Sequence, residues 1–169
     1  LRERTEEAKA FLGAAEDAAK ELRTTVTRLG EIVNTILSEA PSGRPPNVTS
    51  AMWREPRSFV DDMIFDVTFP SGMVIRVDTV LGLHGWEVFI WQYRTAGPRL
   101  PLAQLEAWLR AAGVPFLEQA PIQHDAVVTA NFGAGTVPEE VAPHTAAVVD
   151  AIARAGFAPG EEASAVARP

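Results

Sequence analysis

The sequence predicts an α+β fold, in which a long amphipathic N-terminal helix precedes an antiparallel β-meander with helices on one of its faces, in the order βββαβα. Three observations predict this fold. A heptad repeat occupies the start of the chain, strands of alternating polarity fill residues 63–93, and a helix, a strand and a helix follow. A chain of 169 residues with 47% hydrophobic content can bury a core of ordinary size.

The composition along the chain changes at three points. We therefore predict a helical arm over 1–39, a linker over 40–50, an α+β body over 51–157 and a disordered tail over 158–169. The linker, APSGRPPNVTS, concentrates helix breakers and turn formers. The tail is polar, rich in Ala and ends in Pro, which is typical of a segment without a core.

The arm carries apolar residues at alternating spacings of three and four, the a/d pattern of helices that pack in pairs or bundles. A single helix over this segment would extend roughly 55 Å, which is more than a small domain easily covers. We therefore expect self-association through the arm, with a homodimer as one arrangement. Packing of the same stripe on its own body is the alternative. The residues with most apolar bulk, and hence the expected self-association residues, are Leu22, Val26, Leu29, Val33 and Ile36.

The body begins with two strands in which apolar and polar residues alternate, over 63–69 and 73–80, joined by a turn at PSG. After LGLHG comes GWEVFIWQYR, residues 85–94, which is apolar on both faces. These three segments predict a meander. One face of it carries Phe65, Val67, Ile75, Val77, Val88 and Ile90, and we expect the two body helices to cover that face.

The rest of the body reads as a helix, a strand and a second helix. The first helix, Leu102 to Ala112, ends at Gly113, a residue suited to left-handed backbone. A fourth strand fits Gln123 to Phe132. The last helix has a candidate capping box in Thr136 and Glu139, a first-turn Pro138, and an apolar stripe formed by Val141, Thr145, Val148, Val149 and Ile152.

Cross-strand pairing predicts which charged and aromatic residues lie together on the second face of the meander. A three-residue turn at PSG places Asp66 opposite Arg76, and pairing Trp86 with Val77 would add Glu87 to form an ion row of alternating sign. Beside this row lie three aromatic residues, of types that often anchor interfaces. The sequence leaves open whether the arm or linker, a second copy, or a separate protein or ligand covers this face. The candidate partner-binding residues are Phe89, Trp91, Tyr93, Arg76 and Glu87.

Charge and composition limit the class of partner. The net charge of −7 argues against nucleic acid, because such binding requires a basic surface that releases counterions, and it suits a basic protein partner. The absence of cysteine excludes disulfides and thiolate metal sites. No apolar run in this fragment approaches the roughly 20 residues that span a bilayer, and no secretory pattern opens it, so we expect a cytoplasmic protein. Because the chain begins at Leu1 rather than Met, the sequence leaves open whether a membrane anchor or targeting signal preceded it in a longer protein. The scarcity of lysine beside arginine suggests a GC-rich bacterial genome.

Catalytic and metal-binding patterns are sparse. His84, His124 and His144 lie in different predicted elements, without the paired spacing that brings two imidazoles to one metal ion. Asp61 and Asp62 offer too few converging oxygens for a hard cation by themselves. We therefore predict no catalytic residue, no metal and no cofactor.

The order of elements resembles that of small acidic secretion chaperones, in which a sheet and helices dimerise and bind segments of a client protein. The chaperone pattern has a further strand before its last helix, and we do not place such a strand in this sequence. Our hypothesis is a non-catalytic interaction module (an adaptor, chaperone or immunity-type binder) that self-associates through the N-terminal helix. The alternative is a small-molecule-binding domain or enzyme whose pocket lies between the sheet and that helix, lined by Arg76, Glu87, Trp91, Tyr93 and His84.

Overall fold

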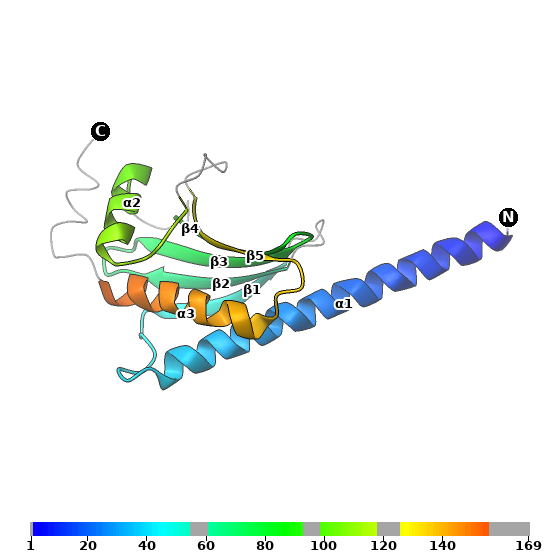
Figure 1. Cartoon of the computed structure of the whole chain (residues 1–169), viewed down its shortest axis with the longest axis horizontal. Coiled ribbons are helices and arrows are strands. Elements are labelled where there is room, and N and C mark those ends of the chain that lie inside the picture. Colours follow the sequence, from blue (N-terminus) through cyan, green and yellow to red (C-terminus); the bar gives the residue numbers. More distant parts are fainter. Residues whose placement is uncertain (1, 55–60, 93–98, 118–125, 156–169) are drawn as a thin grey trace.

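The computed structural model describes residues 2–54, 61–92, 99–117 and 126–155, and it confirms the α+β class (Figure 1). A long helix precedes a five-stranded antiparallel sheet whose strand order follows the chain, β1-β2-β3-β4-β5. The helices are α1 (Arg2–Glu39), α2 (Leu102–Ala111) and α3 (Pro138–Ala155). The strands are β1 (Val48–Arg54), β2 (Asp61–Thr68), β3 (Val74–Gly82), β4 (Gly85–Gln92) and β5 (Val127–Gly133). The predicted tail lies outside the described residues.

Strand β1 was not predicted from the sequence, because it begins within the predicted linker. It pairs with β2 in a register that places Val48 opposite Val67 and Arg54 opposite Asp61. Within residues 48–53 of this strand only Val48 is buried, and polar Thr49 and Ser50 follow it directly. An edge strand with so little apolar surface lacks the alternation that reveals a strand in a sequence.

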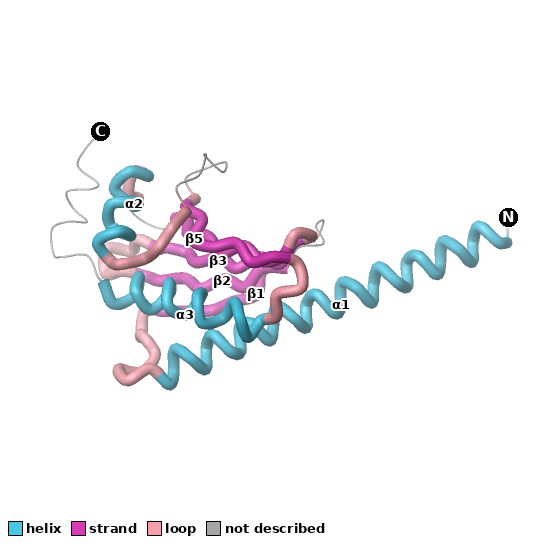
Figure 2. Tube along the Cα trace, viewed as in Figure 1, coloured by secondary structure: helices cyan, strands magenta, loops and turns pink. Residues whose placement is uncertain are grey.

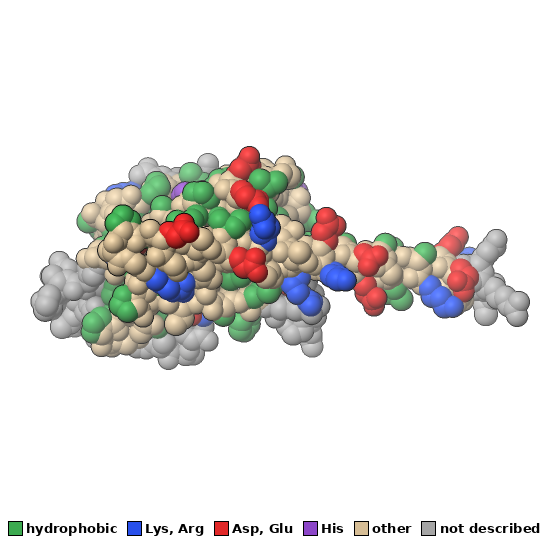
Figure 3. Space-filling model, turned by 90° about the horizontal axis from the view of Figure 1, so that it is seen from below, with side chains coloured by type: hydrophobic (Ala, Val, Ile, Leu, Met, Phe, Trp, Pro, Cys, Tyr) green, Lys and Arg blue, Asp and Glu red, His purple; other side chains and the backbone are tan. Residues whose placement is uncertain are grey.

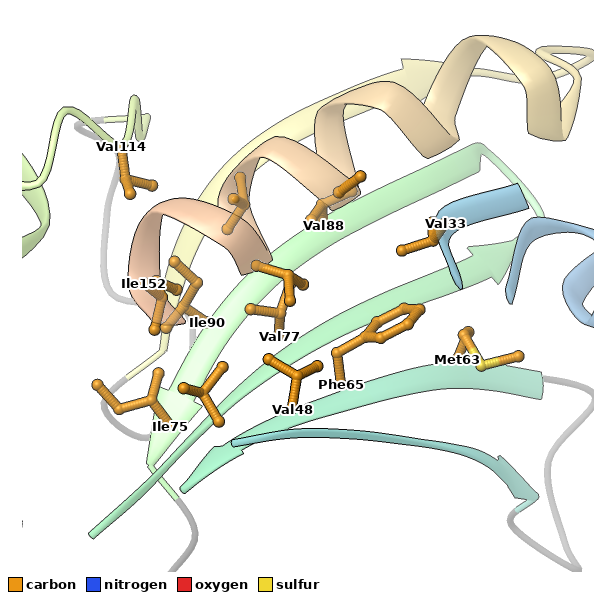
Figure 4. Close-up of a cluster of buried hydrophobic side chains, with 14 of the residues drawn as sticks. Val33, Val48, Met63, Phe65, Ile75, Val77, Val88, Ile90, Val114 and Ile152 are labelled. Carbon is orange, nitrogen blue, oxygen red and sulfur yellow. The ribbon is translucent and has the colours of Figure 1, made fainter. Parts of the chain in front are cut away.

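Helices α1 and α3 lie side by side on one face of the sheet, and the core fills the space between them and the strands (Figures 1 and 2). The buried side chains include Val33 of α1, Ile152 of α3 and Phe65 of β2 (Figure 4). Helix α2 packs at the end of this same face: Leu105 and Leu109 belong to the core, and the Trp108 ring meets the buried Phe69 edge-on at 6.0 Å. Both body helices therefore pack on the expected face, and α1 shares it with them.

Three contacts fix α1 against the body. Arg28 Nε donates to Glu139 Oε1 of α3 over 2.6 Å. Gly30 lies so close to the Met63 side chain that any Cβ at this position would collide with it. At the far end of α3, Arg154 Nη2 donates to the Gly43 carbonyl oxygen over 2.9 Å, which holds the turn after α1. The C-terminal half of α1 is therefore an integral part of the domain.

Polar groups inside the domain have partners that define neighbouring elements. The hydroxyls of Thr79 in β3 and Thr145 in α3 lie 3.1 Å apart, and both residues are fully buried. The buried Gln92 amide donates to the Leu100 carbonyl oxygen over 2.7 Å and accepts from the Leu100 N–H over 2.6 Å. This side-chain amide continues the hydrogen bonding of β4 and so positions the start of α2.

The β3–β4 hairpin differs from the predicted register. Trp86 lies opposite Leu81 rather than Val77, and Glu87 therefore lies opposite Val80. The reason is the turn: β3 continues to Gly82 and β4 begins at Gly85, so that only two residues connect the strands. Gly85 adopts a φ of 113°, and a Cβ there would collide with the Phe132 carbonyl oxygen, so glycine is required for the short turn.

Candidate functional site

The N-terminal half of α1 projects away from the body, and no other described part of the chain covers it (Figure 1). From Arg4 to Glu21 every side chain is exposed, apart from the half-buried Ala15 and Ala19. Phe11 is 74% exposed and Leu12 61%. Figure 3 shows acidic and basic side chains along the projecting part of the helix, with apolar side chains between them. We call residues 2–22 the projecting segment. Two large apolar side chains on a free helix constitute an uncovered surface that is costly in water.

The self-association residues predicted from the sequence behave differently. Val26, Leu29 and Val33 have no exposed surface, because they pack in the core of their own chain. Leu22 and Ile36 are half-buried. Val26, Leu29 and Val33 are therefore unavailable to a second chain, and the expectation that they mediate self-association is wrong. The part of the repeat that stays accessible lies N-terminal to them.

The apolar stripe of α1 is continuous across this change of environment. Ala8, Leu12, Ala15, Ala19 and Leu22 follow the same spacings of three and four as the buried residues after them. At 3.6 residues per turn they lie on the same side of the helix as Val26 and Val33. The side of α1 that packs on the body thus extends, still apolar, beyond the edge of the body.

The second candidate surface is the face of the sheet opposite to α1 and α3. Arg76 of β3 donates from Nε to Asp66 Oδ1 over 2.7 Å and from Nη2 to Asp66 Oδ2 over 2.8 Å. In the observed register Arg76 lies opposite Trp91, not Glu87, and its guanidinium carbon is 5.1 Å from the Trp91 ring centroid. The Trp91 ring therefore takes the place that was predicted for Glu87. The Arg76 guanidinium lies between the Asp66 carboxylate and the Trp91 ring.

Asp78 is a buried carboxyl on the same face. Burial and the nearby Asp62 carboxylate raise its pKa from 3.8 to about 8, against the opposing influence of Trp91 and Arg76. Desolvation is the dominant cause, since Asp78 is 4% exposed. At neutral pH this side chain is therefore mostly a neutral acid, which can donate a hydrogen bond. No pattern in the sequence signals the burial of Asp78.

The four predicted partner-binding residues that the structure describes lie together on this face. Arg76, Glu87, Phe89 and Trp91 all point away from α1 and α3, and all are half-buried. Tyr93 lies outside the described residues. A residue that the prediction did not include is Trp53, which lies opposite Asp62 and is 55% exposed.

The pocket proposed between the sheet and the N-terminal helix is not present in the described structure. Val33 and Leu29 of α1 and Phe65 of β2 fill that space and have no exposed surface. Arg76, Glu87 and Trp91, which were expected to line the pocket, lie on the opposite face. His84 is exposed in the β3–β4 turn. Helix α1 does not cover the aromatic face, because it lies on the other side of the sheet, and core side chains fill the space beneath it.

Histidines and carboxylates do not assemble into a metal site within the described ranges. His144 Nε2 lies 3.1 Å from the Thr129 hydroxyl, and burial lowers its pKa below 6.5. Its ring also meets Phe132 edge-on at 5.8 Å. These contacts indicate a structural role between α3 and β5. His124 lies outside the described residues.

Comparison with known proteins adds no relative. No family model, no curated protein and no solved structure matches this chain. Among the helices described, none combines the length and the apolar composition that crossing a bilayer requires. The function must therefore be argued from the two surfaces themselves.

Proposed function

We propose that this chain is a non-catalytic protein-interaction module that self-associates through α1. The observation that carries the proposal is the apolar stripe of the projecting segment, with Phe11 and Leu12 more than half exposed. Contact with another chain would bury such a segment. An isolated helix of this length is also marginally stable in water, so a packing partner would stabilise the helix itself.

The second sheet face supports a further contact with a partner protein. Asp62, Asp66 and Glu87 give it acidic character, and the Asp66 carboxylate already pairs with Arg76. The exposed Trp53 adds an aromatic anchor at the edge of this face. Together with the net charge of −7, these residues favour a basic protein as the partner. Adaptor, chaperone and immunity-type roles all fit such a module, and a cytoplasmic location remains part of this proposal.

The test of self-association compares solution masses. Light scattering is recorded for the full chain and for a full-length variant with Phe11→Gln and Leu12→Gln, which keeps helix propensity and removes the apolar side chains. We expect a dimer or larger assembly for the full chain and a monomer for the variant. The matched control is Asp17→Asn, on the polar side of the same segment. A monomeric full chain at about 100 μM, a concentration at which even weak specific interfaces form, would contradict the proposal.

A small-molecule-binding domain or enzyme is the second candidate, and Asp78 is the observation that favours it. A buried carboxyl with a pKa near 8 beside a second carboxylate is a feature that functional sites often share. Asp78 lies on the face of the sheet that points away from α1, whereas the sequence predicted a pocket between the sheet and that helix. Ligand screening by thermal shift with the wild type and Asp78→Asn tests it. A compound that stabilises only the wild type supports this function, whereas equal responses of both proteins argue against it.

A further inference from the structure

We propose that the projecting segment pairs with the same segment of a second copy in antiparallel orientation, with Leu12 of one copy against Ala15 of the other. This inference rests on the proposed self-association and names its partner, orientation and register. The partner is a second copy of this chain, and the contact is symmetric about a two-fold axis between residues 13 and 14. Four observations support it.

The first is continuity with an interface that the chain already forms. The side of α1 that packs on α3 and β2 continues without interruption into the projecting segment. Only the surface that meets it changes, from the chain's own body to solvent, at about Leu22. A helix laid along the projecting segment would extend the same packing, with apolar residues at the spacing that helix pairs require.

The second observation is the length of the projecting segment, which selects the register. In an antiparallel pair an a position faces a d position, so possible registers differ by steps of seven residues. Leu12 against Ala15 is the step that overlaps the whole of residues 5–22. The neighbouring steps would leave roughly a third of the segment unpaired or would push the second copy into the body. In the chosen register each N-terminus ends close to the other body, near Thr25.

The third observation is the distribution of large and small residues. In the antiparallel register Leu12 faces Ala15 and Thr5 faces Leu22, so that large residues fill the space beside small ones. Phe11 lies beside Ala18 of the second copy. A parallel pair would instead place Leu12 against Leu12 and each alanine of the stripe against itself. Layers of paired alanines bury little surface.

The fourth observation is charge beside the stripe. Lys9 and Glu16 occupy equivalent flanking positions seven residues apart, and antiparallel pairing places Lys9 of each copy near Glu16 of the other. Parallel pairing would bring Lys9 near Arg4 of the second copy, a like-charge contact. The charges therefore favour the antiparallel pair.

Cysteine cross-linking tests the register in the full chain, which has no cysteine of its own. Ala8 faces Ala19 of the second copy in the proposed pair, whereas two copies of Ala8 are separated by about 16 Å along the axis. A disulfide requires Cα atoms within about 7 Å. We expect a mixture of Ala8→Cys and Ala19→Cys chains, one carrying a size tag, to form the mixed disulfide and neither variant alone to form one. Disulfides within each variant alone would show a parallel pair and overturn the orientation, while self-association would stand.

Charge substitution gives an independent readout. Glu16→Lys places two lysine pairs across the antiparallel contact, and we expect the dimer dissociation constant to rise severalfold. Adding Lys9→Glu should restore it. In a parallel pair Glu16 lies near Phe11, and Glu16→Lys would have no such effect. The matched control is Asp17→Lys, which makes the same charge change on the opposite side of the helix.

The solution mass separates failure of this inference from failure of the proposed function. A dimer without the mixed disulfide means that the copies meet elsewhere, and the register is overturned. A chain that is monomeric at every concentration contradicts both the register and the self-association. If the monomer instead binds another protein through Phe11 and Leu12, the occupant of the stripe is that protein and not a second copy.

Discussion

The guanidinium of Arg76 forms a two-pronged ion pair with Asp66 across the β2–β3 hairpin, through bonds of 2.7 and 2.8 Å. The two side chains are only 12% and 25% exposed. Charge-assisted bonds of this geometry are stronger and more directional than a surface ion pair. The pair therefore ties two strands together on the face that α1 and α3 leave free.

We predict that Arg76→Ala destabilises the protein by about 2–4 kcal/mol, because the partly buried Asp66 carboxylate loses its counter-charge. Arg76→Lys should recover only part of this, since lysine offers a single point of contact and stacks less well on Trp91. Urea denaturation of the three proteins measures the differences. A lysine variant as stable as the wild type would show that the bidentate geometry contributes nothing.

Asp78 predicts a dependence of stability on pH. Its pKa in the folded state, about 8, lies above the unfolded value of 3.8. The stability contribution of the neutral acid is therefore fully present below about pH 4 and is lost as the pH rises through 8, at up to about 1.4 kcal/mol per pH unit. Above pH 6.5 the titration of His144 does not interfere, because its pKa is lowered from that value.

We therefore expect the urea midpoint of the wild type to fall between pH 6.5 and 8.5. Asp78→Asn, which stays neutral, should abolish most of this fall and be more stable than the wild type at pH 8.5. Equal slopes for the two proteins would show that Asp78 ionises normally in the folded state.

Two glycines in the same helix should respond to alanine in opposite directions. Gly30 packs against Met63, so that Gly30→Ala forces this side chain to move, at a cost of about 1–3 kcal/mol. Gly13 has open space around it, and Gly13→Ala should stabilise the helix by up to about 1 kcal/mol. Thermal unfolding followed by circular dichroism measures both. Shortening Met63 to Val in the Gly30→Ala background should recover stability, and a failure to do so would place the strain elsewhere.

Leucines at equivalent positions of α1 should also differ. Leu29 has no exposed surface, and Leu29→Ala should cost about 2–5 kcal/mol of folding stability. Leu12→Ala removes an exposed side chain and should change monomer stability by less than about 0.5 kcal/mol, while it weakens association. Denaturation at concentrations where the chain is monomeric makes the comparison. Similar losses for both variants would contradict the division of α1 into a buried half and a projecting half.

Several parts of the fold could be predicted because they depend on local pattern. The period of α1, the β2–β3 hairpin and the apolar stripe of α3 all follow from residue spacing, and the pairing of Asp66 with Arg76 follows from the three-residue turn. Strand β1 was missed because one buried valine gives no period. The β3–β4 register was wrong because LGLHG reads as a loop, whereas Gly82 and Gly85 permit a turn of only two residues.

The sequence by itself determined that the chain has a long helix with a continuous apolar stripe, an antiparallel sheet with two contrasting faces, and an acidic surface. The tertiary structure decided which half of the stripe is buried, because only the packing of Val26, Leu29 and Val33 against β2 and α3 shows where the body ends. It also decided that α1 packs on the face of the sheet that does not carry Trp91. A heptad repeat specifies that a helix needs a partner, but the same apolar side chains suit the chain's own sheet and a second helix equally well. The shape of the whole domain makes that choice.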